Sequence, residues 1–397
     1  MSGTLNSIYN NTSYALNLNA DAMGVLEEQV STGSRINRAS DDPSNAYQVL
    51  RLNSQQKSLE DYMNNISDMS STLGASSSTI DEMVKAISGQ GGVNESLTQI
   101  LSGTYNEAER KTIAGKINDT LEQMVSLANT QNVGQYIFGG SNTSSAPYAV
   151  QRTNGEITSV TYQGGSQQRN VEVAPGVQAS AYYAGEDTFC SNDRGTPKFL
   201  GDTGAAVGSG TSSVKGNVWL TVTKDSNNHY NLSIDGGPAV DVSTVSDPSN
   251  VAVTNSNGQV LYVDATNINS TGVNMVIVPG TCDVFNTLIT ARDLLENKQG
   301  FSDSQLSVFR GGLSDSVDEV NNLLVGKQAS IGSKIVFLDN LKNSLDNTNN
   351  NTKDRTTTLQ QADVAQLSID IARRQTLYQM ALAVAGKLLS TSLLDYI

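Results

Sequence analysis

Histidine, cysteine and aromatic residues are scarce in this chain of 397 residues. Because His229 stands alone, no zinc site with several imidazole ligands can form, and the motifs H-E-x-x-H and G-x-S-x-G are absent. Cys190 and Cys282 are too few for a disulfide framework. We therefore expect no enzyme activity, with no catalytic residue, no metal and no cofactor.

Basic residues are also in deficit, because 25 Lys and Arg face 39 Asp and Glu, for a net charge of −14. A protein that binds DNA or RNA needs a basic surface to displace counterions from phosphates, so we expect no nucleic-acid partner. No apolar run approaches the roughly 20 residues of a membrane span. The chain also starts without the basic flank and apolar core of a cleavable signal peptide. We expect no membrane insertion, and any export must use another route.

A long apolar stripe is the first positive feature of the sequence. From Val49 to Ile87, mostly apolar residues recur at alternating steps of three and four. This spacing is typical of a long helix packed against partner helices. The glycine-rich segment 88–92 should end that helix.

The middle of the chain changes character. A second helix is predicted for residues 105–132, where Thr104 and Glu107 match a capping box. Between residues 147 and 283, short β-branched runs alternate with Gly, Pro, Asn and Asp, which predicts an inserted β-rich domain. Helical periodicity returns at Val284.

The last third of the chain is again helical in pattern. Apolar spacing runs from Leu313 to Leu345, and the polar stretch 346–358 that follows predicts a frayed end or an extended connection. Residues 5–30 and 364–397 each carry an apolar face that they cannot bury alone in water. We expect both terminal segments to be mobile in the monomer and to fold on assembly.

These patterns predict an α+β protein in which both termini build a long-helix coiled coil or bundle and a β-rich domain is inserted between them. In chain order, we expect an inner helix with its turn (1–48), the first half of the bundle (49–146) and the inserted β-rich domain (147–283). The second half of the bundle (284–358) and a final inner helix (359–397) follow.

Both ends of the chain resemble a known family. Residues 28–52, EQVSTGSRINRASDDPSNAYQVLRL, resemble the N-terminal signature of bacterial flagellins and their hook-associated relatives, and residues 360–397 look like the flagellin-type C-terminus. SDDP at 40–43 and GQYIFGGSNTSSAPY at 134–148 resemble the hook–filament junction branch of this superfamily more than filament flagellin. The length of the chain keeps filament-forming flagellin as the alternative.

The resemblance implies a structural role in the bacterial flagellum, as an adaptor between hook-associated protein type 1 and the flagellin filament. It implies a ring of copies of the chain, type III export with a cytoplasmic chaperone on the C-terminal segment, and an extracellular location. The expected assembly interface consists of terminal apolar residues and of the turn after the first helix: Leu5, Ala15, Leu18, Ala22, Val25, Leu26, Arg35, Ile36, Asn37, Leu377, Ala381, Val384, Leu388, Leu393 and Leu394.

Two further groups of residues have an expected structural role. Asp42 and Pro43 should cap the long helix rather than hold a metal, because Asp supplies an N-cap acceptor and Pro lacks the N–H that is unused at N1. We expect Arg35 and Arg38 to bond an adjacent subunit rather than a phosphate. The segment that leaves the helical domain for the insert is expected to be Tyr136, Ile137, Phe138, Gly139 and Gly140.

The two cysteines lie near the two borders of the insert. Cys190 and Cys282 would lie together if the first and last strands of the insert are neighbours. Whether they form a disulfide is left open by the sequence.

Overall fold

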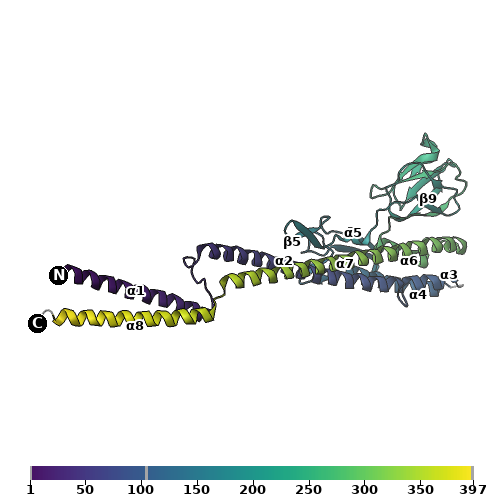
Figure 1. The fold of residues 1–397 in the computed structure, drawn as a ribbon. Coiled ribbons are helices and arrows are strands. Elements are labelled where there is room, and N and C mark those ends of the chain that lie inside the picture. The colour runs from purple at the N-terminus through teal and green to yellow at the C-terminus, as the bar shows by residue number, and fades with distance from the viewer. Residues whose placement is uncertain (1, 103–105, 395–397) are drawn as a thin grey trace. The chain divides into compact units, whose positions relative to one another are not determined.

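The computed structural model describes residues 2–102 and 106–394, which fold as two units (Figure 1). One unit comprises Met1–Asn64 with Leu341–Ile397, and the other comprises Asn65–Asn340. The expected mixture of long terminal helices and a β-rich middle is confirmed. Among the described residues, no helix has both the length and the apolarity that crossing a bilayer requires.

The first unit is built from helices. It contains α1 (Ser2–Thr32), the start of α2 (Pro43–Ser88), the end of α7 (Asp303–Gln360) and α8 (Val364–Leu394). Helices α1 and α8 lie side by side along their length (Figure 1). Chain segments from opposite ends of the sequence therefore form one helical pair.

The long helix expected from the apolar stripe is confirmed as α2, which ends at Ser88, before Gly89. In the second unit its stripe is fully buried at Ile66, Leu73, Ile80 and Ile87, which are seven residues apart. A repeat of seven keeps one face of a helix against its neighbours. Gln328 of α7 donates to Asp81 of α2 at 3.2 Å across this packing.

The prediction of a frayed or extended segment at residues 346–358 is wrong, because α7 continues through it to Gln360. The buried stripe continues from Leu345 to Thr352 and Thr356, each at most 8% exposed. The hydroxyls of Thr352 and Thr356 donate to backbone carbonyls four residues earlier, at 2.8 and 2.9 Å. Small polar side chains can thus continue a helix seam when their own helix satisfies their hydroxyls.

Two shorter helices differ from the prediction. Helix α3 (Val93–Ser102) was not expected, and its Val93, Leu97 and Ile100 are buried. Helix α4 (Glu107–Ala128) starts after Asn106, whose side chain accepts from the backbone of Glu109 at 3.0 Å.

The predicted capping box at Thr104 and Glu107 is therefore wrong for Glu107, whereas Thr104 lies outside the described residues. The side chain of Glu109 instead accepts the backbone N–H of Asn106 at 2.9 Å, which completes the box two residues later. The predicted helix end at residue 132 is wrong too. Strand β1 (Gln131–Asn132) pairs there with β2 (Gln135–Tyr136) in a short hairpin.

The β-rich middle has two parts. The first holds two hairpins, β3 (Tyr148–Thr153) with β4 (Glu156–Tyr162) and β5 (Arg169–Ala174) with β6 (Val177–Tyr182), followed by the short helix α5 (Gly185–Phe189). Hydrogen bonds and packing tie them to the helices of the same unit. Asn65 of α2, for example, donates to the carbonyl of Glu172 in β5 at 2.9 Å.

The second part is a β sandwich. A five-stranded sheet has the order β11-β10-β9-β14-β7 and a three-stranded sheet has the order β12-β13-β8, with every pairing antiparallel. The strands are β7 (Lys198–Leu200), β8 (Ala206–Val207), β9 (Gly216–Lys224), β10 (Tyr230–Ile234), β11 (Val240–Asp241), β12 (Val251–Thr254), β13 (Val260–Asp264) and β14 (Gly272–Val278).

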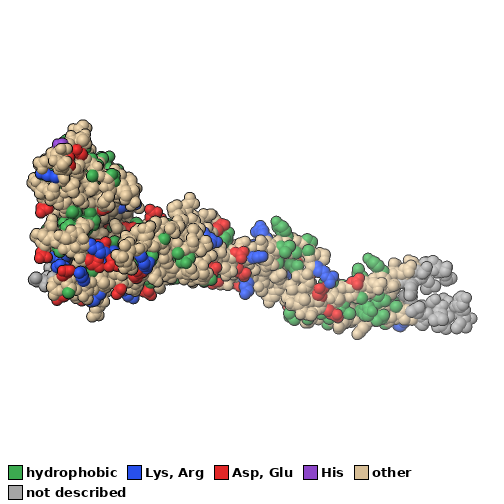
Figure 2. All heavy atoms as spheres, turned by 180° about the vertical axis from the view of Figure 1, so that it is seen from behind, with side chains coloured by type: hydrophobic (Ala, Val, Ile, Leu, Met, Phe, Trp, Pro, Cys, Tyr) green, Lys and Arg blue, Asp and Glu red, His purple; other side chains and the backbone are tan. Residues whose placement is uncertain are grey.

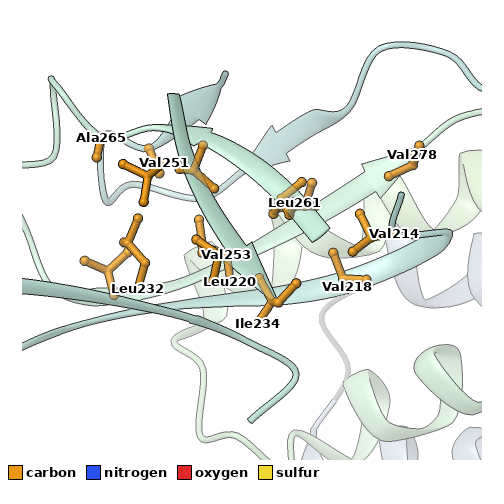
Figure 3. Packing of buried hydrophobic residues seen from close by; sticks show 14 residues of the cluster. Val214, Val218, Leu220, Leu232, Ile234, Val251, Val253, Leu261, Ala265 and Val278 are labelled. Atoms are coloured by element: carbon orange, nitrogen blue, oxygen red, sulfur yellow. The ribbon is translucent and has the colours of Figure 1, made fainter. Parts of the chain in front are cut away.

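Alternate residues of both sheets fill the interior of this sandwich. Figure 3 shows Leu220 and Leu232 of one sheet facing Val253 and Leu261 of the other, and all four side chains are fully buried. Period-two alternation is what places one set of side chains inside a two-sheet core. The short β-branched runs of the sequence therefore form strands whose alternate side chains face the interior of the sandwich.

A buried arginine connects the hairpins to the helices. Arg292 of α6 (Val284–Glu296) has no exposed side-chain surface, and Nη1 donates to Asn118 of α4 at 3.0 Å and to the carbonyl of Ile157 in β4 at 2.8 Å. Its guanidinium also pairs with Asp293 at 2.7 Å. A planar cation with five donors can hold three elements at once.

Candidate assembly interface

The turn between α1 and α2 is paired to the connection between α7 and α8. Gly33 has a φ of +69°, a conformation that glycine adopts without strain, and its carbonyl accepts the N–H of Ala362 at 3.1 Å. The N–H of Arg35 donates to the carbonyl of Gln360 at 2.6 Å. The signature segment at one end of the chain is thereby joined to the segment that begins the other end.

Arg35 and Asp42 hold this turn together. Nη1 of Arg35 lies 3.0 Å from Oδ2 of Asp42, and Nη2 donates to the carbonyl of Leu359 at 3.3 Å. These contacts lie within one chain, so the expected bond from Arg35 to an adjacent subunit stays a prediction. The phosphate alternative gains no support, because the guanidinium already has a carboxylate partner.

Asp42 and Pro43 lie where a cap for α2 is needed. Pro43 is the first residue of α2, and Oδ1 of Asp42 accepts the N–H of Asn45 at 3.0 Å. The backbone and side-chain hydrogen bonds from Asn45, followed by the bond from Arg35, hold the pKa of Asp42 below its usual range. The carboxylate is thus ionised and committed to the helix terminus.

The remaining turn residues form a local network. Oδ2 of Asp41 accepts the N–H groups of Asn37 and Arg38 at 3.0 and 2.7 Å, and the side chain of Asn37 donates to the carbonyl of Ser34 at 3.2 Å. The carbonyl of Ile36 accepts the hydroxyl of Ser34 at 3.0 Å. These bonds fix the turn without a second subunit.

The pair of terminal helices exposes much of its apolar surface. Leu18 and Val25 of α1 are 57% and 40% exposed, and Leu377 and Val384 of α8 are 46% and 52% exposed. Ala15 is exposed as well, whereas Ala22, Leu26 and Ala381 are half-buried. Figure 2 shows hydrophobic side chains gathered on the visible face of these helices, beside the residues drawn in grey. Two helices alone therefore leave this face uncovered.

Part of that face is hollow. A groove of about 390 Å³ lies between α1 and α8, lined by Asn11, Thr12, Ala15, Met380, Ala381 and Val384. Of the other expected interface residues, Leu5, Leu388, Leu393 and Leu394 lie outside the residues whose side chains the structure describes. Further exposed apolar residues that were not predicted belong to the same two helices: Tyr14, Val30, Val364, Ile369, Met380 and Leu382.

The expected domain-joining segment lies in the second unit. Ile137 and Phe138 are fully buried, and the carbonyl of Phe138 accepts the N–H of Gly185 at 2.9 Å. Tyr136 ends β2, and Gly140 has a φ of +60° beside the carbonyl of Gly165, which leaves no room for a Cβ atom.

The two cysteines lie on adjacent backbone segments but are not bonded. Cys190 forms an antiparallel bridge with Asp283, and the N–H of Ser191 donates to the carbonyl of Cys282 at 2.9 Å. Neighbouring residues of an extended segment point to opposite faces, so this register directs the two thiols apart. Sγ of Cys190 instead contacts Oδ2 of Asp283 at 3.4 Å.

Comparison with known proteins finds similarity to flagellar proteins. A family model of the bacterial flagellin N-terminal helical region matches residues 4–143. Flagellar hook-associated protein 3 of Salmonella typhimurium is 30% identical over 141 residues, and the Escherichia coli protein of that name is 29% identical over 126 residues. These matches cover 35% and 32% of this chain and 44% and 39% of the relatives. The chain thus matches about two fifths of the length of these curated relatives.

A solved structure agrees in fold. The crystal structure of flagellar hook associated protein-3 from Legionella pneumophila is similar with a TM-score of 0.54 at 17% identity. The similarity covers 78% of this chain and 98% of that one.

The N-terminal match and the fold point the same way: residues 4–143 match the flagellin N-terminal helical region, and the chain shares its fold with the Legionella protein. The resemblance of residues 28–52 to the flagellin superfamily is confirmed. The curated relatives that match are named flagellar hook-associated protein 3, the type of protein that residues 40–43 and 134–148 resemble.

Proposed function

We propose that this chain is a structural component of the bacterial flagellum, an adaptor at the hook–filament junction that joins hook-associated protein type 1 to the flagellin filament. The observation that carries the proposal is the exposed apolar surface of α1 and α8, in a chain similar to relatives named flagellar hook-associated protein 3. The role needs binding surfaces and no chemistry, so we propose no enzyme activity.

The exposed apolar surface of the terminal helices supports assembly into a ring of copies. Leu18, Leu377 and Val384 are each about half exposed although they lie on paired helices. Helices from neighbouring copies would bury these side chains, and burial of apolar surface contributes about 25 cal/mol per Å². We propose that the terminal helices are marginal in the monomer and become ordered in an inner coiled-coil tube.

The same surface bears on export. An apolar face on α8 that is unpartnered before assembly would aggregate in the cytoplasm, and a chaperone bound to the C-terminal segment would prevent this. We propose that the chain leaves through the flagellar type III apparatus and works outside the cell.

Electron microscopy of purified full-length protein, with and without flagellin seeds and hook tips, tests the proposal. The adaptor should stay as monomers alone and add only at hook tips that carry hook-associated protein type 1, after which flagellin should add to it. Long filaments from the protein alone would instead identify it as a filament-forming flagellin. The N-terminal family match and the length of the chain are compatible with that outcome.

A further inference from the structure

A histidine lies between two carboxylates at one edge of the β sandwich, in the unit that does not contain α1 and α8. Asp225 follows β9, His229 precedes β10, and Asp241 ends β11. Nδ1 of His229 lies 3.7 Å from Oδ2 of Asp225 and 3.8 Å from Oδ2 of Asp241. The three ligand atoms fall within 4.8 Å of one another, and His229 is the only histidine of the chain.

Each carboxylate is held in place by its other oxygen. Oδ1 of Asp225 accepts the N–H groups of Asn227 and His229 at 2.9 and 2.8 Å. Oδ1 of Asp241 accepts the N–H and the hydroxyl of Ser243 at 2.8 and 2.7 Å. Both Oδ2 atoms therefore face the imidazole, and the backbone fixes the direction of both side chains. Preorganised carboxylates of this kind are what a metal site needs around its ligands.

A second aspartate of the sandwich, Asp264, forms the same kind of turn as Asp241 and serves as a comparison. Asp264 accepts the N–H and the hydroxyl of Thr266 at 2.9 and 2.6 Å, the same arrangement that Asp241 makes with Ser243. In the described part of the chain, Asp264 belongs to no such group of ligand atoms. This type of turn thus forms without a nearby histidine. The turn itself therefore does not require the imidazole that faces the two carboxylate oxygens at Asp225 and Asp241.

We propose that His229, Asp225 and Asp241 bind a divalent transition-metal ion such as Zn²⁺. Imidazole nitrogen and carboxylate oxygen are both zinc ligands, with bonds of about 2.0–2.2 Å that place tetrahedral ligand atoms about 3.4 Å apart. The two distances from His229, 3.7 and 3.8 Å, would shorten by a few tenths of an ångström. The carboxylate oxygens of Asp225 and Asp241, which lie within 4.8 Å of each other, would move together by up to about 1.4 Å. Two carboxylates and a neutral imidazole also balance the charge of the ion.

The ion would join elements that are weakly connected. Strand β11 is the edge of the five-stranded sheet and pairs with β10 through two residues, Val240 and Asp241. A metal bridging Asp241 to the β9–β10 turn would fasten this edge. The hydrogen bond between Ser243 Oγ and His229 Nδ1, 3.2 Å, would be exchanged for the metal bond, while the hydroxyl keeps Asp241 as acceptor.

Calorimetric titration of the full-length chain with ZnCl₂, after removal of metals with a chelator, tests this proposal. We expect one ion per chain and a higher melting temperature with the ion present. His229→Gln and Asp241→Asn should each weaken binding tenfold or more. Asp264→Asn, the matched turn variant, should bind like the wild type.

Circular dichroism and melting curves without metal establish that each variant folds. Absence of zinc binding to the wild type would overturn the proposal. Equal binding by folded His229→Gln would overturn it too, since the ion would then lie elsewhere. The result is independent of assembly, so it can fail while the adaptor function stands, and the reverse also holds.

Discussion

At the residue scale, Arg35 is the side chain that most clearly links the signature segment to the rest of its unit, because it bonds Asp42 within the segment and the carbonyl of Leu359 outside it. Arg35 reaches the end of α7 and Asp42 caps α2, so one ion pair connects a turn, a helix start and a helix end. The sequence indicated the cap from the Asp-Pro pair alone. It could not indicate that the arginine bonds the end of α7 in its own chain, because its partner carbonyl lies 324 residues away.

Removal of the Asp42 carboxylate should lower the melting temperature. The pKa of Asp42 is lowered in the folded chain, so its charged form stabilises the fold above its ordinary value of 3.8, and this contribution is lost as the pH falls through the folded pKa. We expect Asp42→Asn, which keeps the capping oxygen, to differ from the wild type at pH 7 and to converge with it in acid. Melting curves against pH check this, and a constant difference would contradict it.

Arg292 should be among the most sensitive positions. Its side chain is fully buried with partners in three elements, and deletion of one partner in a buried charged network lowers the free energy of unfolding by about 3–5 kcal/mol. Arg292→Ala should therefore shift the urea midpoint strongly. Arg152→Ala, which removes a surface ion pair with Glu122, serves as the control and should change the free energy by less than about 1 kcal/mol. Similar effects for both variants would contradict this account.

The two cysteines should be free and unreactive in the native protein. Burial raises the pKa of the Cys282 thiol to about 12 and also raises the pKa of Cys190, where the carboxylate of Asp283 adds to the effect. A thiol reagent at pH 8 should react slowly with the folded chain and should count two thiols per chain in denaturant without reductant. A count of zero would show a disulfide and contradict the register described above.

At the element scale, helices marked by a regular repeat of aliphatic residues could be predicted from the sequence. The part of α7 in which polar residues continue the buried stripe could not. Helices α2 and α6 follow from the spacing of their aliphatic residues. Helix α3 is only ten residues long and lies just after the glycine-rich break, so its short apolar pattern was overlooked. The last turns of α7 were misjudged because threonine occupies seam positions at which an aliphatic residue was expected.

The buried threonines give a direct test of the helical continuation of α7. Thr352→Asp places a charge at a position that is 6% exposed, and an unsatisfied buried polar group lowers stability by about 1–3 kcal/mol. Thr357→Asp puts the same residue at an exposed position of the same helix and should have little effect. Melting curves followed by helical circular dichroism distinguish the two variants. Equal stability would mean that residues 346–358 do not pack as described.

At the scale of the whole molecule, the fold class was predictable because helical and strand periodicities occupy separate stretches of the chain. The subdivision of the insert into hairpins and a sandwich was not, since strand pairing depends on contacts far apart in sequence. The cluster at His229 was hidden although its residues are close in sequence, because the register of two hairpins decides whether they meet. Asp225 and Asp241 come from either side of it and meet it only once β9, β10 and β11 have paired.

The central claim is that the exposed apolar face of α1 and α8 drives assembly. Val384 is 52% exposed on that face, and Gln375 is an exposed polar residue of the same helix. Val384→Glu should fold like the wild type, because the side chain is already in solvent, yet it should prevent burial against neighbouring copies. Gln375→Glu makes the same charge change on the side of the helix opposite Val384 and serves as the matched control.

The decisive measurement is the fraction of hook tips that carry the protein in electron micrographs, for the wild type and these two variants at equal concentration. The account predicts occupied tips for the wild type and Gln375→Glu, and bare tips for a folded, monomeric Val384→Glu. Tips occupied equally by Val384→Glu would contradict it.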